Sequence, residues 1–108
     1  MTVPSLALLI GAALVFSAGG YFMKLSQGLT VLGPSAAVFA CFVLGAALQA
    51  LAMRGASMSS TYIIVLGLEA VTAYALGVLA LGEPQSWLKL VGAMVVVLGV
   101  LLLRLADG

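Results

Sequence analysis

The chain has 108 residues, of which 65% are hydrophobic and only 6% are charged, with a formal net charge of +1. A domain of this size has too little interior to bury so many apolar side chains, so its composition excludes an ordinary soluble protein and indicates a membrane protein. The absence of histidine argues against a zinc or iron site, the single Cys41 excludes an intrachain disulfide, and the scattered basic residues argue against nucleic-acid binding. We therefore expect the lipid bilayer as a partner, with no nucleic acid, no metal and no cofactor.

Four segments are long and apolar enough to cross a bilayer, because a spanning helix needs about 20 apolar residues to cover roughly 30 Å of hydrocarbon. They comprise residues 4–23, 34–53, 57–81 and 86–105. We therefore predict an all-α fold, in which residues 1–108 form one membrane domain of four transmembrane helices. The short loops leave no soluble domain to hold an enzyme active site.

Local signals at the segment ends agree with these boundaries. Pro4 suits the first turn of a helix, and the polar residues 24–28 close the first segment. No basic stretch precedes this segment, so we expect it to be retained rather than removed as a signal peptide. Pro34 opens the second segment, and Ser57 or Ser59 is a plausible N-cap for the third. Gly-Glu-Pro at residues 82–84 is a stop signal before the fourth.

The basic residues are balanced between the two sides of the membrane. An even number of spans places both termini on one side together with Arg54 and Arg104, whereas Lys24 and Lys89 lie on the other. Because orientation follows the Lys and Arg bias, we predict dual topology, with oppositely inserted copies pairing as an antiparallel homodimer. The alternative is that the terminal amine or the insertion machinery fixes one orientation. An antiparallel dimer would reproduce the inverted repeats of many transporters.

Glu69 lies near the middle of the third segment. A charge at that depth costs about 2.5–3.5 kcal/mol on insertion scales, so an ionisable residue there is by default a functional hypothesis. Three interpretations are open: a proton or cation site, a structural carboxyl group bonded between helices, and a group hydrated near the interface. We favour the first, in which a proton and a cationic substrate compete for one carboxylate.

Several side chains are candidates to share this site with Glu69. Tyr62 lies seven residues earlier and therefore on the same helix face, and Thr72 lies on the same side. Aromatic faces attract alkylated cations, so Tyr62 and Phe42 could line the site, with lipid or helix packing as the alternative.

A second polar stripe lies on the first helix, where Ser17 and Tyr21 are four residues apart. These two side chains either belong to the proton and substrate site or form hydrogen bonds between helices. Gln49, in the second helix, is interpreted as a packing contact rather than as a ligand.

Glycines mark candidate helix contacts. Gly67, two residues before Glu69, suits either a hinge for access switching or close helix packing. Gly92 and Gly99 lie on one face of the fourth helix, and small residues at this spacing let helices associate in lipid. We expect this pair to form a dimer contact, although glycine is also common in membrane helices.

A series of short motifs extends over nearly the full chain: Met23-Lys24-Leu25-Ser26-Gln27-Gly28, Pro34-Ser35, Tyr62, Gly67, Gly82-Glu83, Gly92 and Gly99. In their order and spacing the chain resembles the small multidrug resistance family, four-helix proteins that work as antiparallel dimers. The resemblance implies proton-coupled export of small cations, commonly quaternary ammonium compounds, guanidinium ions or polyamines. It also implies that Tyr62 helps to form the substrate site and that Gly92 and Gly99 support the dimer.

The chain departs from the family at two positions. The family's defining carboxylate lies in the first helix, eight residues before the lysine, where this chain has Phe16. A family aromatic in the third helix is replaced by Val65. We hypothesise that the acid has moved to Glu69 on the facing third helix and remains in the same central cavity.

These observations together predict a proton-coupled antiporter that exports small organic cations across a bacterial inner membrane, with Glu69 as the shared site. The alternatives are a carrier for a lipid-linked or other substrate and a non-transporting partner chain in a heterodimer.

Overall fold

The computed structural model describes residues 3–106 of the chain. The fold is all-α, as predicted, with helices long and apolar enough to span a membrane and no β-strand within the described residues. The helices are α1 (Val3–Leu25), α2 (Leu32–Ala52), α3 (Met58–Leu79) and α4 (Trp87–Ala106). A single 3-10 turn, Met53–Gly55, follows α2.

The helix ends differ from the predicted boundaries by a few residues. α2 begins at Leu32, before Pro34, because a proline is tolerated in the first helical turn, where its missing N–H has no partner within the helix. Of the two candidate N-caps of α3, Ser57 and Ser59, the structure shows Ser57, whose side chain accepts a hydrogen bond from the Ser60 backbone N–H. α3 ends at Leu79, earlier than expected, and Gly82 follows in the left-handed region with φ +67°.

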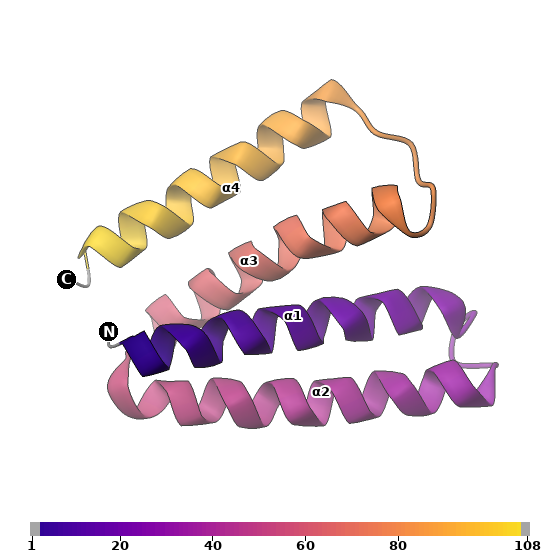
Figure 1. Cartoon of the computed structure of the whole chain (residues 1–108), viewed down its shortest axis with the longest axis horizontal. Helices are drawn as coiled ribbons and strands as arrows, with labels where there is room; N and C mark the ends of the chain where they lie inside the picture. The colour runs from indigo at the N-terminus through magenta and orange to yellow at the C-terminus, as the bar shows by residue number, and fades with distance from the viewer. Residues whose placement is uncertain (1–2, 107–108) are drawn as a thin grey trace.

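The helices are arranged in the order α2, α1, α3, α4 (Figure 1). α1 and α2 run antiparallel as a hairpin, α1 also packs against α3, and α3 packs against α4. The Cα trace measures 42 × 34 × 17 Å, so the arrangement is flat and open rather than a closed four-helix bundle. Within Trp87–Ala106 no residue of α4 is buried.

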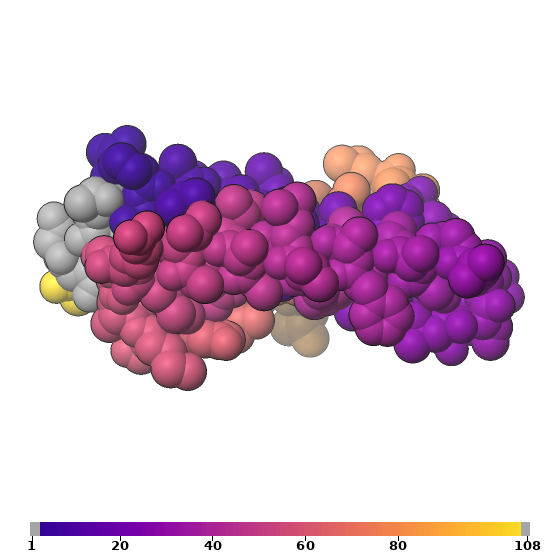
Figure 2. All heavy atoms as spheres, turned by 90° about the horizontal axis from the view of Figure 1, so that it is seen from below, coloured from indigo at the N-terminus to yellow at the C-terminus, as the bar shows by residue number. Residues whose placement is uncertain are grey.

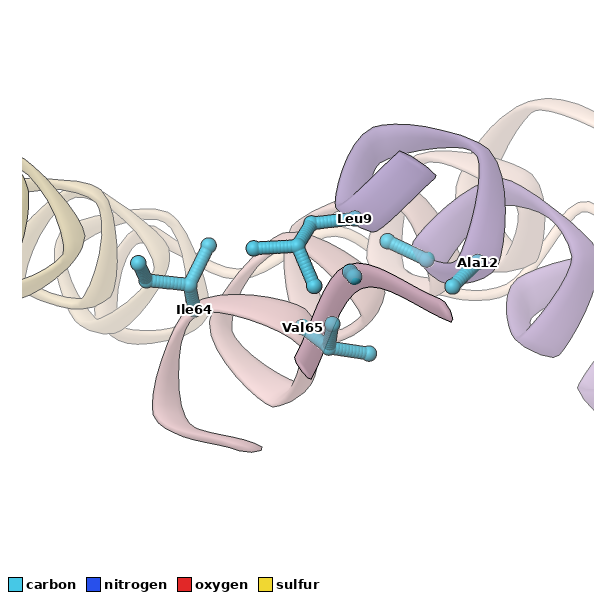
Figure 3. Close-up of a cluster of buried hydrophobic side chains, with 6 residues drawn as sticks. Leu9, Ala12, Ile64 and Val65 are labelled. Atoms are coloured by element: carbon cyan, nitrogen blue, oxygen red, sulfur yellow. The ribbon is translucent and has the colours of Figure 1, made fainter. Parts of the chain in front are cut away.

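The buried apolar core lies where α1, α2 and α3 meet. Its residues are Leu9, Ala12, Ala13, Ala52, Ile64 and Val65, several of which Figure 3 shows between α1 and α3. Three of these side chains are alanines, which let the helix backbones approach closely without a large side chain between them. The core therefore fixes how α3 lies against the α1–α2 hairpin.

A reciprocal contact holds α1 against α2. The ring of Phe16 on α1 lies over Gly45 on α2, where an added Cβ would be 2.7 Å from a ring carbon. The ring of Phe42 on α2 lies over Gly19 on α1, where an added Cβ would be 2.8 Å away. The centroids of the two rings are 5.2 Å apart. Each phenylalanine therefore fills the space that a glycine on the other helix leaves open.

The basic residues lie at the ends of the helices. Arg54 follows α2 and Arg104 lies in the last turn of α4, at the end of the molecule where α1 begins. Lys24, in the last turn of α1, and Lys89, in the first turn of α4, lie at the opposite end. This is the even distribution on which the dual-topology prediction rests; the insertion itself stays a prediction.

Candidate functional site

Glu69 lines a cavity of about 440 Å³ between α1, α2 and α3. The cavity is lined by Phe16, Phe42, Ala46, Gln49, Ala50, Met53, Tyr62, Val65, Leu66 and Glu69. The structure thus brings together three residues that the sequence analysis had placed in one site: Glu69, Tyr62 and Phe42. Figure 2 shows the face on which α2 lies across the molecule, with the first turns of α3 beside its C-terminal half.

The lining combines one carboxylate and one amide, that of Gln49, with mostly aromatic and aliphatic side chains. Phe16 and Phe42 pack at a tilt of 42°, and Tyr62 adds a third ring from the helix that carries Glu69. None of the described lining residues is basic. A deprotonated Glu69 therefore has no positive side chain beside it among the described lining residues.

Ser17 binds the backbone of α3 at the level of the carboxylate. Its hydroxyl donates a hydrogen bond to the main-chain oxygen of Glu69 at 3.1 Å, and the side chain is only 1% exposed. Ser17 is not among the residues that line the cavity. Its hydroxyl joins α1 to α3, which is the interhelical alternative that the sequence had left open.

Tyr21 and Thr72 also lie outside the cavity lining. The Tyr21 ring packs edge-on against Phe22, with centroids 5.7 Å apart. The Thr72 hydroxyl donates to the backbone oxygen of Leu68 at 2.8 Å, within its own helix. A direct part in substrate binding stays an untested prediction for Ser17, Tyr21 and Thr72.

Comparison with known proteins now identifies the chain's relatives. The sequence model described as Small Multidrug Resistance protein matches residues 5–97. The chain belongs to the Small Multidrug Resistance family. A guanidinium exporter from Citrobacter freundii and one from Salmonella typhimurium are each 32% identical to it over 85 residues, which are 79% of this chain and 81% of the relative. A guanidinium exporter from Escherichia coli K12 is 29% identical over the same shares.

The family match and the four spanning helices make this chain a multi-pass transport protein of the bacterial inner membrane. In this Small Multidrug Resistance chain, Phe16 and Glu69 line the same cavity from different helices. Glu69 and Phe16, the position where the resemblance led us to expect a carboxylate, therefore face one common space.

Several lining residues of this family member were not predicted for the site, among them Phe16 and Gln49. Phe16 was noted only as a departure from the family pattern, and Gln49 was interpreted as a packing residue, whereas both line the cavity. For Gln49 a signal was present in the sequence, because it lies seven residues after Phe42 and therefore on the same face of α2. The packing interpretation of Gln49 is therefore incomplete.

The candidate contact glycines of this family member differ in their surroundings. Gly67 is buried where α4 packs against α3, and an added Cβ would lie 2.5 Å from Val100 and 3.2 Å from Val96. The structure thus shows close packing at Gly67, and a hinge there stays a prediction. An added Cβ at Gly92 or Gly99 would meet no described atom within 4 Å. Both positions are open to a partner, and their dimer contact stays a prediction.

Proposed function

We propose that this chain is a proton-coupled antiporter that exports small organic cations and that Glu69 binds the proton and the substrate in turn. The observation that carries the proposal is the position of Glu69 as the one charged side chain among the described residues that line a largely apolar cavity within a membrane protein. A cation and a proton each neutralise this carboxylate, so binding of one favours release of the other. That competition is the basis of exchange.

The relatives support a cationic substrate, because they carry the name guanidinium exporter. The rings of Phe16, Phe42 and Tyr62 support it independently, since aromatic faces attract cations by about 0.5–2 kcal/mol each. We expect Glu69 to replace the carboxylate that the family pattern places at Phe16, because both positions line one cavity.

We further propose that two oppositely inserted copies form the transporting unit. No described residue of α4 is buried, and the arrangement of the helices is flat. The residues that line the cavity come from α1, from α2 with the turn after it, and from α3, and none of them comes from α4. A second, inverted copy would supply a second Glu69 and an access route from the other side of the membrane.

The test is cation exchange in liposomes. Purified protein is reconstituted with a pH gradient, and uptake of guanidinium and of tetraethylammonium is measured together with proton movement. We expect coupled exchange for the natural chain and loss of coupled exchange for Glu69→Gln, because an amide cannot alternate between two charge states. Glu69→Asp keeps the carboxylate and should retain part of the activity.

Glu83→Gln is the matched control, because Glu83 is exposed and lies in the loop after α3, outside the cavity. It should exchange cations at close to the natural rate. Exchange at the natural rate by Glu69→Gln, with correctly assembled protein, would refute the assignment of Glu69.

A further inference from the structure

Gln49 is a buried polar side chain that faces the substrate cavity. It lies on α2, is only 7% exposed, and lines the cavity together with Glu69 of α3. Between the described residues no hydrogen bond engages its side-chain amide. The amide is also not among the polar atoms that protein fully encloses without a partner. The amide therefore keeps some accessible surface on a residue that lines the cavity.

A ligand that covers this amide without supplying a hydrogen bond leaves it unpaired, which is unfavourable, so a ligand that supplies the hydrogen bond is favoured. Glu69 and the aromatic rings attract cations of suitable size, and the carboxylate of Glu69 also accepts hydrogen bonds from N–H groups. Tyr62 carries a hydroxyl, but this residue is exposed in the chain. The amide of Gln49 adds an uncharged hydrogen-bond acceptor to the cavity, which a cation with several N–H donors can use in addition to Glu69.

We propose that Gln49 is a specificity-determining residue whose side-chain oxygen accepts an N–H of the bound cation. This inference rests on the proposed cation transport and adds a selection rule to it. Cations that carry N–H donors, such as substituted guanidinium ions, satisfy the amide. Fully alkylated ammonium ions have no N–H and leave it unpaired. A site built to form a hydrogen bond discriminates against an analogue that lacks the donor.

The test compares two monovalent cations that differ in N–H content, butylguanidinium and tetraethylammonium. Their dissociation constants are measured by calorimetry at one pH for the natural chain and for Gln49→Met, which keeps an unbranched side chain of similar length. We expect the preference for butylguanidinium over tetraethylammonium to fall by about tenfold, the effect of one hydrogen bond. A ratio of constants that does not change would overturn the inference.

Ser35→Ala is the matched control, since Ser35 is a buried polar residue of α2 whose hydroxyl bonds the backbone oxygen of Val31, away from the cavity. It should leave the ratio at the natural value. Glu69→Gln separates the two proposals. If Glu69→Gln binds both cations as tightly as the natural chain does, the proposed function fails. The role of Gln49 is decided separately, by whether Gln49→Met changes the ratio of the dissociation constants of the two cations.

Nuclear magnetic resonance provides a second readout that does not depend on transport. The side-chain NH₂ resonances of Gln49 are identified by their loss in Gln49→Met. They should shift more when butylguanidinium is added than when tetraethylammonium is added, and equal shifts would contradict the inference. If Gln49→Met does not assemble, Gln49→Leu supplies the same comparison of dissociation constants.

Discussion

Ser17 shows how one hydroxyl holds the turn of α3 that carries the carboxylate. Its hydrogen bond of 3.1 Å goes to the backbone oxygen of Glu69, so it acts on the position of the residue rather than on its charge. A hydrogen bond between membrane helices contributes about 0.6 kcal/mol on average, and at most roughly 1.7 kcal/mol. That is small for stability, but it acts directly at the proposed site.

Ser17→Ala should therefore lower the free energy of unfolding by about 0.6 kcal/mol. It should also weaken cation binding, because the turn of Glu69 loses its link to α1. The measurement is denaturant unfolding in detergent micelles, followed by calorimetry of guanidinium binding. Ser17→Thr keeps the hydroxyl and should restore binding. Equal binding by Ser17→Ala and the natural chain would show that the link does not position Glu69.

At the scale of the element, α1 and α2 depend on matched large and small side chains. Phe42 occupies the space beside Gly19, so a methyl group there would clash with the ring, whereas Gly20 has no described atom within 4 Å of an added Cβ. The same interlock places Phe16 and Phe42 at the wall of the cavity. Packing between the two helices and the shape of the site are thus set by the same contacts.

Gly19→Ala should destabilise the protein by about 1–3 kcal/mol, the usual cost of overpacking. Gly20→Ala, on the next residue of the same helix, should be neutral or should stabilise by about 0.5–1 kcal/mol, because alanine favours a helix. The free energies of unfolding of the two variants, measured by denaturant unfolding under the same conditions, test this prediction. Equal effects would mean that the Phe42–Gly19 contact does not limit the approach of α1 and α2.

At the scale of the whole molecule, the flat arrangement leaves α4 with no buried residue among those described. Its apolar surface is compatible with lipid, and the open positions Gly92 and Gly99 lie on it. Two basic residues stand at each end of the molecule, Arg54 and Arg104 against Lys24 and Lys89. Neither end therefore has a charge advantage for remaining in the cytoplasm.

We accordingly expect reporters fused to the C-terminus to be found on both sides of the membrane. Pairs of reporters that are active only in the cytoplasm or only in the periplasm measure this distribution. An extra lysine in the loop after α1 should shift it one way, and an extra lysine after α4 should shift it the other way. Activity on one side only, unaffected by added lysines, would remove dual topology.

The sequence by itself determined the membrane class, the four spans and the shared face of Tyr62 and Glu69. These features depend on composition and on spacing along one helix, which the chain carries locally. Helix ends were less well defined, since Pro34 is compatible with a start two residues earlier.

Only the tertiary structure decided which faces of the helices meet. α1, α2 and α3 are apolar nearly all round, so no hydrophobic stripe in the sequence shows which side points inward. The rotation of each helix is instead set by contacts between helices, such as Phe16 on Gly45 and Phe42 on Gly19. For that reason Phe16 and Gln49 line the cavity, whereas Ser17 contacts the backbone of α3.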